Sequence, residues 1–115
     1  MKSNLAVRAT LGVALLGAAL GFSSAAFAVD ADAAQAVMKK SDCFKCHSVD
    51  KKKEGTPLKE VAKKYKGKAD AEATLTKHIT TKPMVEVDGK KEEHRAVKTT
   101  DAAEIKNVVQ WILSL

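Results

Sequence analysis

The two cysteines of this chain lie in one pentapeptide, and that stretch constrains the fold more than any other. Residues 43–47 read Cys-Phe-Lys-Cys-His. Two thiols three positions apart, with an imidazole directly after the second, match the attachment motif of c-type haem. On a helical turn these residues share one face, so both sulfurs can form thioethers to the haem while His47 approaches the iron. The pentapeptide therefore predicts a haem bound by Cys43, Cys46 and His47.

Two other kinds of site use the same spacing of cysteines. A redox-active Cys-x-x-Cys is typical of a helix that follows a strand, and no strand pattern precedes Cys43. A structural zinc site needs a fourth ligand, which His78 or His94 could supply, but such sites usually bring a second closely spaced pair of ligands. The pentapeptide favours haem and leaves zinc as the alternative.

The first 28 residues have the pattern of a cleaved secretory signal peptide. Lys2 and Arg8 accompany an apolar run over residues 11–22, and residues 26–28 form an Ala-Phe-Ala cleavage site. The run is shorter than the roughly 20 residues that a helix needs to cross a bilayer. We therefore expect export to the bacterial periplasm and a single domain over residues 29–115, with no membrane span after cleavage. Export favours haem, because covalent attachment takes place on exported apoprotein.

The exported part has little apolar volume of its own. Its aromatic residues are Phe44, Tyr65 and Trp111, and a domain of this size usually needs a metal, a disulfide or a cofactor for stability. A covalent porphyrin would supply the missing apolar centre. We therefore expect the haem to serve as core and cofactor together.

The charge of the chain restricts its partners. The net charge is +6, and removal of Lys2 and Arg8 lowers it by two. This mild excess fits docking onto an acidic protein surface. Residues 51–53, all lysines, are either part of such a surface or a solvated loop. Nucleic-acid binding is not expected, because the lysines lack interleaved aromatic residues.

Apolar residues recur at helical spacing in four stretches. The first begins at Asp30 or Asp32 and ends just before the pentapeptide, and the last begins at Asp101. Between them, one helix covers residues 58–65 and another follows Asp70. An alternating segment before an Asp-Gly turn, at residues 85–89, permits a small hairpin.

These features together resemble a small bacterial class I cytochrome c. The likeness rests on the leader, the pentapeptide, the loop of Gly55 and Pro57, residues 61–65 and the Trp-Ile-Leu of residues 111–113. It implies an all-α fold of about four helices around one haem, with crossing N- and C-terminal helices. It also implies a monomeric periplasmic protein, not an enzyme, that passes single electrons between redox proteins. The alternative is a haem sensor or ligand-binding protein with a displaceable or absent distal ligand.

The resemblance implies a distal iron ligand, usually Met, on the loop before the last helix. Met84 follows a proline, as in the family, but lies 27 residues before Trp111, farther than in short members. His94 lies 17 residues before Trp111, and we expect it to be the distal ligand. Met84 stays an alternative, and His78 is better explained as a packing residue. The family's Gly-Pro pair, whose carbonyl orients the proximal histidine, is interrupted here by Thr56, so the partner of His47 stays open.

Overall fold

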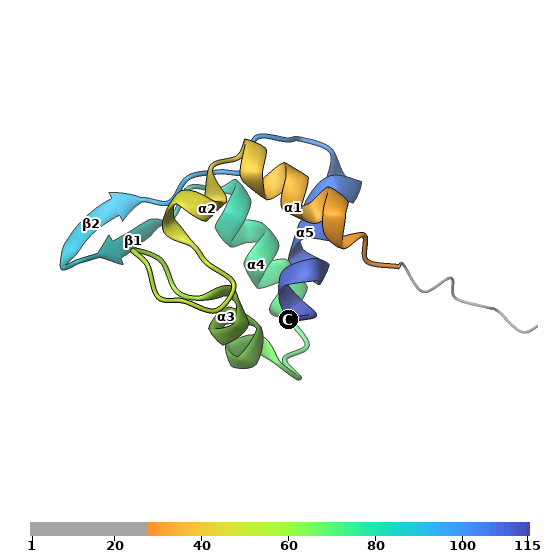
Figure 1. Cartoon of the computed structure of the whole chain (residues 1–115), viewed down its shortest axis with the longest axis horizontal. Coiled ribbons are helices and arrows are strands. Elements are labelled where there is room, and N and C mark those ends of the chain that lie inside the picture. Colours follow the sequence, from red (N-terminus) through yellow and green to blue (C-terminus); the bar gives the residue numbers. More distant parts are fainter. Residues whose placement is uncertain (1–27) are drawn as a thin grey trace, which may run out of the picture.

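The structure is a computed structural model that describes residues 28–115, so the predicted signal peptide lies outside the described residues except for Ala28. The described part forms five helices and one hairpin (Figure 1). No helix within this range combines the length and apolarity that a membrane crossing requires. The elements are α1 (Ala31–Lys40), α2 (Cys43–Cys46), α3 (Leu58–Tyr65), α4 (Ala71–Thr80), β1 (Met84–Val87), β2 (Lys90–Glu93) and α5 (Ala102–Leu113).

The two terminal helices begin where their capping residues predict. Asp30 caps α1 by accepting a hydrogen bond from the Ala33 N–H at 3.0 Å. Asp101 caps α5 by accepting from the N–H groups of residues 103 and 104 at 2.8 and 3.0 Å. The expected capping box is altered, because the Glu104 carboxylate accepts from the Thr99 hydroxyl. Both predicted starts are confirmed.

The helices pack around α5. Helix α1 lies across α5, and α3 and α4 pack against other parts of it (Figure 1). The expected crossing of the terminal helices is therefore confirmed, as is a mainly helical architecture. The buried core cluster consists of Ala34, Met38, Leu58, Leu75, Val108, Val109, Trp111 and Ile112.

A buried polar contact joins the two ends of the domain. The Asn107 side chain on α5 accepts a hydrogen bond from the Asp30 N–H at 2.9 Å and donates one to the Asp30 carbonyl at 2.8 Å. Asn107 is 7% exposed, so its amide has few alternatives to these partners. The pair therefore holds the start of α1 on the middle of α5.

The predicted hairpin is present and projects from the helical body (Figure 1). Strands β1 and β2 are antiparallel, with Val87 opposite Lys90. The turn residues Asp88 and Gly89 have φ angles of 48° and 78°, as a two-residue hairpin loop requires. At its base, the His94 N–H donates to the Pro83 carbonyl at 2.8 Å. The hairpin thereby places His94 beside the end of α4.

Candidate functional site

The pentapeptide forms α2 and the residue that follows it. The turn is entered through Asp42, whose φ of 63° lies in the left-handed region, and is closed by a 2.9 Å hydrogen bond from the His47 N–H to the Cys43 carbonyl. Asp42 lies 2.8 Å from the ammonium of Lys98 and 3.2 Å from that of Lys45. Hydrogen bonds from these lysines, Lys98 first, lower the pKa of Asp42. The ion pair to Lys98 ties α2 to the segment before α5.

The ring of His47 is oriented by a backbone carbonyl. Its Nδ1 lies 2.7 Å from the Thr56 oxygen, and a carbonyl oxygen can only accept, so Nδ1 carries the proton. The lone pair is then on Nε2, the nitrogen left free to bind a metal. The inserted Thr56 therefore provides the carbonyl whose identity the sequence left open.

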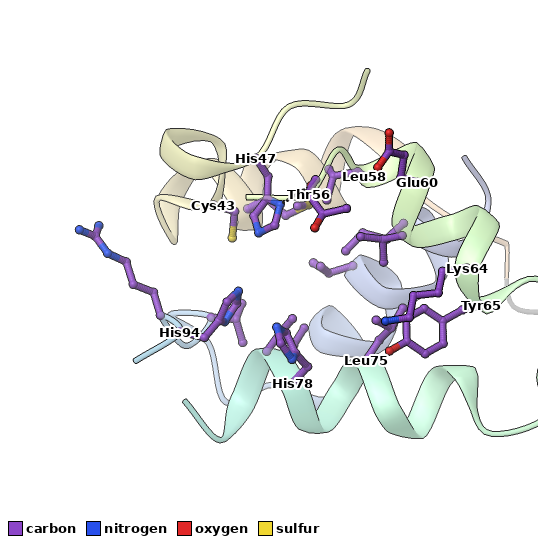
Figure 2. A pocket seen from close by; sticks show the side chains of 17 residues that line it. Cys43, His47, Thr56, Leu58, Glu60, Lys64, Tyr65, Leu75, His78 and His94 are labelled. Carbon is purple, nitrogen blue, oxygen red and sulfur yellow. Dashed lines mark hydrogen bonds between the residues drawn. The ribbon is translucent and has the colours of Figure 1, made fainter. Parts of the chain in front are cut away.

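A cavity with apolar walls lies between α2 and α4 (Figure 2). Cys43 and His47 line one side, and His78 and His94 line the opposite side. The walls come from α1, α3, α4 and α5, through Met38, Leu58, Val61, Leu75, Ile79, Val108 and Ile112. A slot with apolar walls and an imidazole on each face has the donor set and the environment that haem requires. The residues present therefore fit the predicted cofactor.

His94 faces His47 across this cavity. Their ring centroids are 6.1 Å apart. Two imidazoles that bind one metal atom through nitrogens at about 2.0–2.1 Å have ring centroids roughly 6 Å apart. The spacing between the two histidines therefore suits a single iron atom between them.

The surroundings of His94 favour its neutral form. Burial lowers the pKa of His94, and the nearby His78 and His47 lower it further, while hydrogen bonding with the Arg95 backbone acts in the opposite direction. A neutral imidazole is the form that can bind a metal. Its Nδ1 is buried and makes no hydrogen bond.

His78 was expected to be a packing residue, and the structure places it beside His94. The two ring centroids are 4.4 Å apart, with 56° between the ring planes. Burial lowers the pKa of His78, with further contributions from His47 and Lys64. The sequence showed that His78 shares a face with Leu75 and Ile79. The sequence did not indicate that this face of the helix lies against His94.

Met84 does not reach the cavity. Its side chain is 60% exposed on β1 and is not among the lining residues. Of the two distal candidates on the segment before α5, the geometry brings His94 to the cavity and leaves Met84 outside. Among residues 28–115, no three or more His, Cys, Asp and Glu residues are arranged to hold a metal ion.

The thiol of Cys46 lies near the Glu54 carboxylate, at 3.4 Å. Burial raises the pKa of both thiols, and at Cys46 the Glu54 carboxylate adds to the effect. Both cysteines are free in the structure. They are therefore available as protonated thiols on one turn, as thioether formation at two neighbouring vinyl groups requires.

Comparison with known proteins gives a consistent result. A family model described as "Cytochrome c" matches residues 31–115. The chain is similar to the class 1 cytochrome MtoD from Sideroxydans lithotrophicus ES-1, with 49% identity over 76% of this chain and 97% of that chain and a TM-score of 0.73. It is also similar to wild-type cytochrome c552 of Nitrosomonas europaea, with 32% identity over 75% and 99% of the two chains and a TM-score of 0.55. A search of curated proteins found no match.

The close approach of Gly55 to His47 generates a prediction. A Cβ at position 55 would lie 2.7 Å from His47 Cε1 and 2.8 Å from His47 Nδ1, so Gly55→Ala should push the ring away from Thr56. We expect a loss of about 1–3 kcal/mol in the free energy of unfolding. We also expect a high-spin component in the ferric absorption spectrum of the haem-loaded protein, because the proximal bond weakens.

Gly67→Ala is the matched control. Its Cβ would meet nothing within 4 Å, but its φ is +75°, so the substitution should cost roughly 1–2 kcal/mol through backbone strain alone. The ferric spectrum of this variant should equal that of the wild type. A Gly55→Ala protein with wild-type stability and spectrum would show that the contact with His47 has no consequence.

Proposed function

Because this chain belongs to the cytochrome c family and is therefore an electron-transfer haem protein, we propose that it is a periplasmic electron carrier with one covalently bound haem c. The observation that carries the proposal is the single pentapeptide turned toward an apolar cavity with a histidine on each face. With one pair of cysteines in the chain, there is one attachment site.

Four side chains hold the haem in this proposal. Cys43 and Cys46 would form the thioethers, and His47, through Nε2, and His94 would be the ligands of the iron. When bound, haem supplies an iron atom that gains and loses one electron. The Thr56 carbonyl holds His47 in the required tautomer. Apolar side chains make up much of the cavity wall, and they would offer few hydrogen-bonding partners to water around the haem.

The identity of the distal ligand sets the expected reduction potential. A second neutral imidazole donates more strongly to ferric iron than a thioether does, so ligation by His94 gives a lower potential than ligation by Met84 would. We therefore place this protein among the lower-potential carriers of its family.

The basic side chains near the attachment turn support a docking role toward acidic redox proteins. Lys45 lies within α2, and its side chain is 67% exposed. Lys53 lies in the following loop, where its ammonium donates to the Phe44 carbonyl at 2.7 Å. Asp42 at this turn is surrounded by the cations of Lys45, Arg95 and Lys98, so the turn keeps an excess of positive charge. This charge can steer an acidic partner toward the site of electron transfer. In this proposal the protein acts as a monomer.

Export and haem number are tested by the mass of the purified protein. When the full chain is produced in a bacterium with a haem-attachment system, the periplasmic fraction should contain a polypeptide that begins at Val29. Its intact mass should equal that of residues 29–115 plus one haem. A mass that retains the leader, or that lacks haem, would contradict the proposal.

The ligand assignment is tested by His94→Ala and Met84→Ala. We expect the ferric wild type and Met84→Ala to be low-spin, because the exposed Met84 does not touch the cavity. We expect His94→Ala to become high-spin, because its iron loses a ligand. Absorption spectra of the ferric proteins distinguish these outcomes. A high-spin Met84→Ala protein beside a low-spin His94→Ala protein would show the assignment to be wrong.

Carbon monoxide separates electron transfer from the rival function. The reduced wild-type protein should bind carbon monoxide slowly or not at all, since His94 occupies the distal position. The His94→Ala protein is the positive control and should bind it rapidly. Rapid binding by the wild type would instead favour the sensor or ligand-binding alternative.

A further inference from the structure

The distal side of the cavity holds two histidines, and only one is needed to bind iron. His94 comes from the base of the hairpin and His78 from α4, and both rings point into the cavity (Figure 2). We propose that His78 is a positioning residue, which accepts a hydrogen bond from Nδ1 of His94 and thereby sets the orientation of that ring. This role rests on the proposed ligation of the iron by His94.

The two proposed iron ligands, His47 and His94, differ in the hydrogen bonding of their Nδ1 atoms. An imidazole that binds a metal through one nitrogen carries a proton on the other, and that N–H needs an acceptor. For His47 the acceptor is the Thr56 carbonyl at 2.7 Å. For His94 the corresponding Nδ1 is buried and makes no hydrogen bond. Nδ1 of His94 therefore lacks the hydrogen-bond acceptor that Nδ1 of His47 has.

His78 is the side chain best placed to meet this requirement. Its ring centroid lies 4.4 Å from that of His94, so the two rings are already in contact. A neutral imidazole offers one acceptor nitrogen. At this separation of the rings, a change in side-chain torsion can present that nitrogen to Nδ1 of His94. The rival acceptor is the backbone of Arg95, whose hydrogen bonding to His94 raises the pKa of that residue, but the Nδ1 atom itself has no hydrogen-bond partner.

Backbone hydrogen bonds hold these two histidines in fixed relation. The Val97 N–H donates to the Ile79 carbonyl at 2.9 Å, and the His94 N–H donates to the Pro83 carbonyl at 2.8 Å. Ile79 follows His78 on α4, so the segment that carries His94 is tied to the helix that carries His78. The backbones that carry the two rings are therefore held close together, and only side-chain torsions have to change for the hydrogen bond to form.

An acceptor at Nδ1 has two consequences for the iron. It fixes the plane of the His94 ring, and it makes the imidazole a stronger donor, which stabilises the ferric state. His78 should therefore influence the reduction potential and the ferric electron paramagnetic resonance spectrum without binding the iron.

The experiment compares His78→Phe, His78→Asn, His78→Gln and Thr80→Ser in the haem-loaded protein. Phe keeps a ring but has no acceptor, whereas the amide carbonyls of Asn and Gln can accept. Thr80→Ser is the matched control, because Thr80 is exposed on α4 and does not line the cavity. We expect His78→Phe to stay low-spin, with a higher midpoint potential and shifted g-values. Asn or Gln should restore part of both changes, and Thr80→Ser should behave as the wild type.

The alternatives give different results. A His78→Phe protein with wild-type potential and g-values, beside a high-spin His94→Ala protein, overturns the role of His78 and leaves the ligand assignment intact. A shift that Thr80→Ser reproduces, or that neither amide variant reverses, also overturns it. If His78→Phe is high-spin and His94→Ala is low-spin, then His78 is the distal ligand and the proposed assignment fails.

Discussion

The hydrogen bond between His47 and the Thr56 carbonyl determines which ring nitrogen of His47 is free to bind a metal. Because this bond holds the proton on Nδ1, the lone pair of His47 is on the other ring nitrogen, on a ring that lines the cavity. The bond requires Gly55, since any side chain there would collide with the imidazole ring. The loop from residue 48 to residue 57 therefore does more than connect two helices, because it holds the Thr56 carbonyl against the His47 ring.

The cavity and the hydrophobic core are parts of the same packing arrangement. Met38, Leu58, Leu75, Val108 and Ile112 belong to the buried cluster and also line the cavity. A covalently attached porphyrin would thus extend the core and not occupy a separate pocket, which is how a domain with so few aromatic residues can be stable. Helix α5 belongs to both the core and the cavity, because it packs against α1, α3 and α4 and supplies part of the cavity wall.

Local signals in the sequence predicted much of this arrangement. The caps at Asp30 and Asp101 and the Asp88-Gly89 turn depend on near neighbours, and all three are found in the structure. Contacts that depend on distant segments could not be derived in this way. Helical spacing places His78 on an apolar face but does not show that His94 covers it. Similarly, the interrupted Gly-Thr-Pro sequence does not show which carbonyl reaches His47.

The proposed site has one iron atom between two imidazoles, from His47 and His94. X-ray absorption at the iron edge of the ferric, purified protein tests this directly, because nitrogen and sulfur neighbours scatter differently and lie at different distances. We expect only nitrogen neighbours, from the porphyrin, His47 and His94. A sulfur atom in the first coordination shell would show that a methionine binds the iron and would contradict ligation by His94.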